Sequence, residues 1–227
     1  MKLNASKTHS IIISRSRTLD PPHPYLQVSG EQIENVDTLR LLGVTLDPKL
    51  TFEKHIRSFS SSISQKIGLL RKVYKTFACD ATVIKSFYAF ILPHFEYCSP
   101  VWLSAADCHL KLLDRSLNSI SFILPHLSLD LCHRRKVGAL SLLFKVFNNP
   151  QHPLHGVLPG PYVRARATRF TSNLNDLAMS RVNFFTTQFS RCFVPAMVDL
   201  WNKLPNELVN SAHISIFKSR VNAFLQH

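Results

Sequence analysis

Apolar residues recur every three or four positions between residues 52 and 77, and this spacing predicts one long amphipathic helix. They stand at positions 52, 56, 59, 63, 67, 70, 74 and 77. Asp47 and Pro48 come shortly before this pattern. A carboxylate can cap free backbone N–H groups and proline fits the first helical turn, so the pair predicts where the helix begins.

Three further helices are predicted downstream. One begins at Asp80, and Pro93 ends or kinks it. The next opens with a capping box made by Ser104 and Asp107, and the last covers residues 129–147. The apolar residues expected to face inward from the first two are Val83, Phe87, Phe90, Ile91, Leu110, Leu113, Leu117 and Ile120.

The two ends of the chain have a different pattern of apolar and polar residues from the middle. Near the start, the apolar runs at 10–14 and 39–46 predict short buried strands, separated by a proline-rich stretch. After residue 148 the chain is rich in Pro and Arg, and then apolar residues return at 189–205 and from 213. We therefore expect a mainly α fold with a short N-terminal β-hairpin, a helical bundle, a Pro/Arg-rich arm and a small α-rich C-terminal unit. The expected domains are 1–51, 52–147 and 148–227.

Net charge points to a polyanionic partner. The 227 residues include 27 Lys and Arg against 14 Asp and Glu, which gives +13 and a pI near 9.9. Residues 52–147 alone hold 13 basic and 6 acidic side chains. Nucleic acid is the first partner that such a balance indicates, ahead of an acidic membrane surface.

Basic residues cluster in three places that are candidates for phosphate contact. In the long helix they are Lys54, Arg57, Lys66, Arg71, Lys72 and Lys75. The second cluster is Arg134, Arg135 and Lys136, near a helix start where the dipole favours acids. The third is Arg164, Arg166 and Arg169, whose alternation would align them in an extended segment. A solvated helix face and an ordinary linker remain the alternative interpretations.

Signatures of a self-contained enzyme or a metal site are missing from the sequence. It has no Asp-Asp pair, no glycine-rich phosphate loop, no Cys-x-x-Cys and no His-Glu-x-x-His. Cys108-His109 and Cys132-His133 are adjacent pairs, and neighbours on a helix point about 100° apart, so neither pair suits one tetrahedral ion. We expect no metal and no cofactor.

Localisation is expected to be intracellular, in the nucleus or the cytoplasm. Five cysteines without regular spacing indicate a reducing compartment, and Met1 to Ser10 lacks the apolar core of a signal peptide. The longest apolar stretches are too short to span a bilayer, so no membrane partner is expected.

Four segments in order resemble one family. "LNASKTHSIIISRSR", "LRLLGVTLDPKLTFEKHI", "ILPHFEYCSPVW" and "LLDRSLNSI" are similar to the end of reverse transcriptases from non-LTR (LINE-type) retrotransposons, particularly jockey-like elements. The later stretches "YVRARATR", "FSRCFVPAMVDLWNKLP" and "FKSRVNAFL" resemble the C-terminal segment that follows in the same polyproteins.

The resemblance implies a place for each segment in a right-hand polymerase. Lys7 matches the family's palm lysine, and Leu42, Gly43 and Val44 match the primer-grip hairpin that holds the primer's 3′ end. The helices of 52–147 would form the thumb, which closes over the template–primer duplex.

One departure decides what activity we expect. The family's catalytic Asp-Asp motif, which would hold Mg²⁺ in the parent polymerase, has no counterpart in this sequence. We therefore expect a fragment, not itself an enzyme, that binds RNA–DNA or DNA duplexes with tolerance of sequence. The alternative is a protein–protein module that self-associates or docks on a full-length polymerase.

Overall fold

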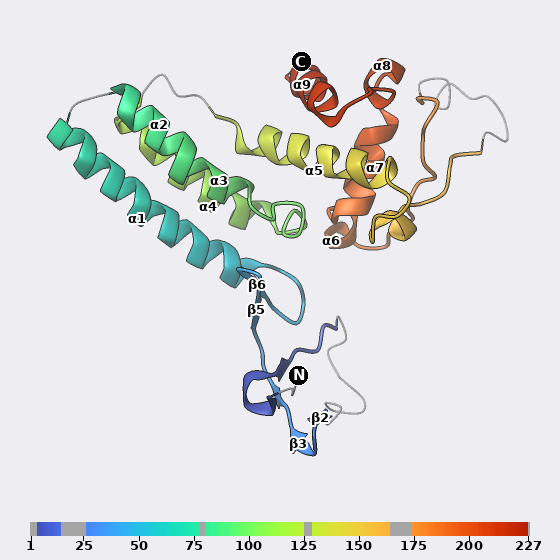
Figure 1. Ribbon diagram of the computed structural model, residues 1–227, viewed down its shortest axis with the longest axis horizontal. Helices are drawn as coiled ribbons and strands as arrows, with labels where there is room; N and C mark the ends of the chain where they lie inside the picture. Colours follow the sequence, from blue (N-terminus) through green and yellow to red (C-terminus); the bar gives the residue numbers. More distant parts are fainter. Residues whose placement is uncertain (1–3, 15–25, 78–79, 125–128, 164–173, 227) are drawn as a thin grey trace.

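The computed structural model describes residues 4–14, 26–77, 80–124, 129–163 and 174–226 (Figure 1). A lobe of short strands hangs from one end of a long helix, other helices lie along that helix, and a second group of helices sits beyond them (Figure 1). This arrangement confirms the mainly α fold with a short N-terminal β-hairpin.

The described part of the N-terminal lobe forms three two-stranded sheets. β1 pairs with β4 in parallel, whereas β2–β3 and β5–β6 are antiparallel, and Leu41 is opposite Val44 in the last pair. The elements are η1 (Ala5–Lys7), β1 (His9–Ser10), β2 (Gln27–Val28), β3 (Glu31–Gln32), β4 (Glu34–Asn35), β5 (Leu39–Leu41) and β6 (Val44–Leu46).

Two expectations about this lobe were wrong. The apolar run at 10–14 was expected to be a buried strand, but β1 ends at Ser10 and Ile13 is 52% exposed. Leu41 is also largely exposed, although Val44 is buried. The strands are only two or three residues long, and each has one neighbour in its two-stranded sheet, so apolar side chains on the open faces stay in solvent.

The helical bundle follows the apolar spacing of the sequence. Its core combines one stripe from α1 with buried residues of the shorter helices, and Trp102 is 1% exposed within it. Phe90 was expected to face inward and is instead 71% exposed. The elements are α1 (Glu53–Phe77), α2 (Asp80–Phe90), α3 (Leu92–Glu96), α4 (Asp107–Asn118) and η2 (Ser119–Phe122).

The long helix begins later than its sequence signal. Asp47 does not cap α1 directly, because its carboxylate accepts the backbone N–H groups of Lys49, Thr51 and Phe52 at 3.1, 3.0 and 2.8 Å. These bonds hold a loop in which Leu50 and Phe52 have φ of +51° and +57°. The helix therefore starts at Glu53, after this loop.

Helix caps in the rest of the chain are mixed. The expected capping box of α4 is absent, because Ala106 is the cap and no side chain bonds there. At α5 (Leu131–Phe147), Asp130 Oδ1 accepts the N–H groups of Cys132 and His133 at 2.8 and 3.2 Å. This carboxylate supplies the negative charge that the basic run near the helix start otherwise lacks.

The C-terminal unit has its own core around Trp201, which is fully buried. Most buried residues of α5 belong to this core, although α5 lies within the 52–147 segment that the sequence assigned to the thumb-like domain. No helix of the described ranges has the length and apolar content needed to cross a membrane. The remaining elements are η3 (His155–Val157), α6 (Thr187–Ser190), α7 (Phe193–Asn202), α8 (Asn206–Val209) and α9 (Ile214–Phe224).

Candidate nucleic-acid interface

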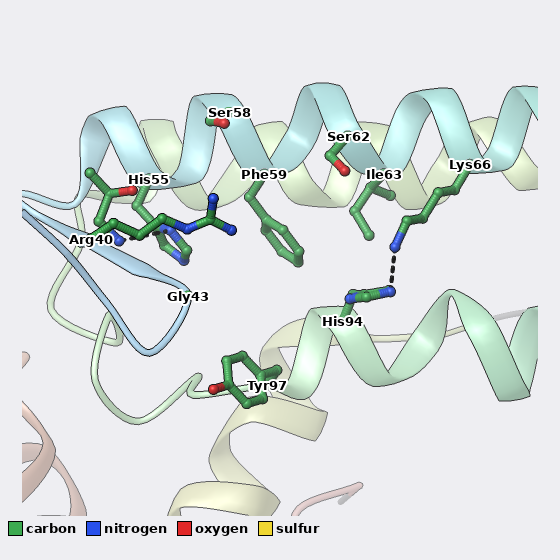
Figure 2. A pocket seen from close by; sticks show the side chains of 11 residues that line it. Arg40, Gly43, His55, Ser58, Phe59, Ser62, Ile63, Lys66, His94 and Tyr97 are labelled. Atoms are coloured by element: carbon green, nitrogen blue, oxygen red, sulfur yellow. Dashed lines mark hydrogen bonds between the residues drawn. The ribbon is translucent and has the colours of Figure 1, made fainter.

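A groove of about 500 Å³ lies where the β5–β6 hairpin, α1 and α3 meet (Figure 2). α1 runs along one wall, the hairpin lies at one end, and α3 and the segment that follows it lie across from α1 (Figure 2). The lining residues are Arg40, Gly43, Thr45, His55, Ser58, Phe59, Ser62, Ile63, Lys66, His94 and Tyr97.

The hairpin turn is strained and tied to the opposite wall. Leu42 and Gly43 have φ of +46° and +86°, as a tight two-residue turn requires, and leucine adopts such a φ only at a cost. The Tyr97 hydroxyl donates a hydrogen bond to the Leu42 carbonyl at 2.8 Å. Leu42 is 80% exposed, Gly43 lines the groove and Val44 is buried below. Their primer-grip role stays a prediction.

Serines lie on two sides of α1, one facing the groove and the other facing the helical bundle. Ser58 and Ser62 line the groove, where their small hydroxyl side chains leave room for a ligand (Figure 2). Ser60 and Ser64 face α4 instead, with their hydroxyls 2.7 and 3.3 Å from the Ser116 hydroxyl. The serine-rich stretch thus brings α4 close on one side and keeps the other side open.

Two histidines in the groove have a lowered pKa. His55 Nδ1 accepts the Thr45 N–H at 3.4 Å, and its pKa is lowered by burial and then by the Arg40 charge. His94 Nε2 is hydrogen-bonded to the Lys66 ammonium (Figure 2), and its pKa is lowered by partial burial and then by that charge. Both rings therefore titrate below the ordinary histidine range.

Carboxylates are missing from the described residues that line this groove. Carboxylates close to it in sequence are engaged elsewhere: Glu53 accepts from Arg57 at 2.8 Å, Glu96 pairs with Arg134, and Asp47 accepts three backbone N–H groups of its loop. Arg40 and Lys66 therefore leave a net positive groove with hydroxyl and imidazole groups between them. Such a surface favours an anionic ligand.

The predicted cations of α1 do not form one row. Lys54 and Lys72 are exposed and 18 residues apart, which is five turns or about 27 Å along the same face, and Arg57 and Lys75 repeat this spacing. Lys66 lies in the groove instead. Arg71 donates to the Ser119 carbonyl at 2.9 Å.

The three side chains of the second basic cluster point in different directions from α5. Arg134 pairs with Glu96, and Lys136 lines a separate pocket between α4, α5 and α7. Arg135 is only 5% exposed, with its guanidinium 3.7 Å from an Asp114 oxygen and 5.9 Å from the centre of the Trp102 ring. A buried guanidinium is not free to meet a phosphate, so we leave Arg135 out of the interface.

Of the remaining predicted residues, the structure describes Lys7 alone. Arg164, Arg166 and Arg169 fall outside the described residues. Lys7 is exposed at the end of η1 and is not among the groove's lining residues. Nucleic-acid contact by any of the predicted residues stays a prediction.

Sequence reasoning missed Arg40, His55, His94 and Tyr97. One signal was present, because positions 55, 58, 62 and 66 have helical spacing and carry polar side chains beside the apolar stripe of α1. The other residues come from separate elements, and their spacing in the sequence gives no sign that they meet.

Comparison with curated proteins finds a similarity to the probable RNA-directed DNA polymerase from transposon X-element of Drosophila melanogaster. The two are 23% identical over 124 residues, which is 52% of this chain and 13% of the relative. The chain thus matches a small part of that protein's length. No protein-family profile and no solved structure matches the chain. The similarity confirms the resemblance seen in the motifs: the chain is related to the reverse transcriptases of non-LTR transposons.

Proposed function

We propose that the chain binds template–primer nucleic acid, an RNA–DNA or DNA duplex, in the groove between the β5–β6 hairpin, α1 and α3, and that it does so without catalysing synthesis. The observation that carries the proposal is the composition of the groove. Arg40 and Lys66 line it together with two histidines and two serine hydroxyls, and no carboxylate is among its described lining residues.

These groups suit the phosphodiester backbone better than the bases. Cationic and hydroxyl side chains are the usual partners of phosphate oxygens, and contacts to phosphate carry no sequence information directly. Binding in this groove would therefore tolerate many sequences. Leu42, at the exposed tip of the hairpin, adds an apolar surface beside the groove that suits contact with a sugar or a base at a strand end.

Absence of synthesis is proposed from the sequence. Polymerases of this class use clustered carboxylates to hold two Mg²⁺ ions, and the sequence has no adjacent pair of aspartates. Copying of RNA into DNA, the activity in the name of the X-element relative, would then require carboxylates from beyond this chain.

Binding to an RNA–DNA hybrid should weaken steeply as salt rises, and a variant with R40Q and K66Q should flatten this dependence. Each cation that leaves a phosphate contact lowers the slope of log K against log salt by about one, so the double variant should lose about two. Fluorescence anisotropy over a salt series measures the slope.

The matched control carries R115Q and K145Q, which remove the same charge from exposed positions on α4 and α5. It should keep most of the wild-type slope. Equal loss of slope in both double variants would point to diffuse charge attraction and against a groove. Tight binding that salt does not affect would contradict nucleic-acid binding through phosphates.

A second candidate function is self-association, and it is favoured by aromatic side chains in the segment before and within α6. Phe184, Phe185 and Phe189 are 55%, 100% and 40% exposed. Exposed aromatics close together are typical of protein interfaces. Sedimentation velocity without nucleic acid should then detect a dimer that the variant F184S/F185S abolishes. A monomer across the concentration range would exclude this candidate.

A further inference from the structure

Two groups that can each carry positive charge touch inside the groove. Lys66 comes from α1 and His94 from α3, and the Lys66 ammonium is hydrogen-bonded to His94 Nε2 (Figure 2). An ammonium group only donates, so His94 Nε2 must accept and the ring proton must reside on Nδ1. The contact is therefore possible only while His94 is neutral.

No described residue that lines the groove gives this pair a negative partner. The charged and titratable groups that face it are Arg40 from β5, His55 from α1 and Tyr97 from the segment after α3. Glu96, two residues beyond His94, is bound to Arg134 on α5. Partial burial, and then the charge of Lys66, lower the pKa of His94. A site that holds cations together without an anion is arranged for a ligand that supplies one.

We propose that Lys66 and His94 form a binding site for one phosphodiester group. When the phosphate enters, the Lys66 ammonium leaves His94 and donates to the phosphate instead. His94 Nε2 then binds a proton from solvent. The N–H bond formed by this proton is the one covalent change, and the phosphodiester itself stays intact. His94 Nε2–H becomes a second donor to the phosphate, beside Lys66, and the negative ligand compensates both charges. This inference rests on the proposed function and adds proton uptake at a named atom.

Its consequence is a pH dependence of known sign. In the free protein the pKa of His94 is lowered, and a bound phosphate next to the ring raises it. Affinity is then unaffected by pH above the bound-state pKa and increases as pH falls toward the free-state pKa. The total gain is about tenfold for each unit by which binding raises the pKa of His94.

The experiment measures affinity for an RNA–DNA hybrid from pH 5.5 to 8.5 at constant ionic strength. Wild type should bind more tightly at low pH, whereas H94Q should bind with little pH dependence and keep its salt dependence. H213Q is the matched control, since His213 is an exposed histidine in the C-terminal unit. NMR titration of the His94 ring, with and without hybrid, should show its pKa rise on binding. His94 is exposed, so H94Q is expected to fold.

Three outcomes would overturn the inference, each with a separate meaning. Salt-dependent binding without pH dependence would remove the proton uptake and leave the proposed function standing. Loss of the pH dependence in H55Q, with retention in H94Q, would assign the proton to His55 and exclude the exchange at Lys66. Absence of salt-dependent binding would reject the proposed function and this site with it.

Discussion

Replacing Trp201 with alanine should lower the free energy of unfolding by about 3–5 kcal/mol. The indole is fully buried between three phenylalanines, with ring centres at 6.4 Å from Phe144, 5.2 Å from Phe147 and 5.9 Å from Phe217. Its Nε1–H also donates to the Leu177 carbonyl at 3.0 Å, so the smaller side chain leaves both a cavity and an unpaired acceptor.

Urea denaturation followed by circular dichroism measures this loss. The control is F90A, because Phe90 is 71% exposed, and its effect should stay within about 0.5 kcal/mol. Trp201 belongs to the core of the C-terminal unit and does not line the groove, so the folded variant should keep the wild-type affinity for nucleic acid. A loss below 1 kcal/mol would mean that this core is not packed as described.

Replacing Trp102 with alanine should cost a similar 3–5 kcal/mol and should also weaken nucleic-acid binding. The Trp102 ring is 1% exposed and lies behind the groove, with centres 6.4 Å from His55 and 6.5 Å from Phe59, which both line it. Arg135 packs over the same ring, and the variant would leave this buried guanidinium with less compensation.

The comparison of the two tryptophan variants separates stability from binding. Both should unfold at lower urea than wild type, but only W102A should lose affinity for the hybrid under conditions where each is folded. Equal affinity in both variants would show that the groove does not depend on the ring behind it, and would weaken the assignment of the groove as the interface.

Periodicity predicted the helices well because helical hydrogen bonds and the three- to four-residue spacing of a buried face are local in sequence. The apolar steps of three and four from 56 to 74 became the buried and partly buried stripe of α1. The start of α1 was missed, since Asp47 bonds three N–H groups of a loop before the helix begins. That choice depends on positive φ at Leu50 and Phe52, which neither residue type signals.

The site was only partly predictable because it is assembled from distant segments. Lys66 was identified from charge, but its partners Arg40 and His94 belong to other elements. The run of charge at 134–136 also suggested more available cations than the fold provides. Successive helical residues point in different directions, and Arg135 is buried. Charge in a sequence indicates a partner, whereas only the fold selects which cations remain available.

The hydrogen bond from Tyr97 to Leu42 joins the hairpin to the wall across from α1. If the groove binds nucleic acid as proposed, this hydrogen bond sets its width beforehand, so binding would order little of the protein. The nucleic acid would then have to change shape to fit the groove. Duplexes that differ in diameter or stiffness would therefore bind with different affinities. The Tyr97 hydroxyl thus limits how far the hairpin can move away from the opposite wall.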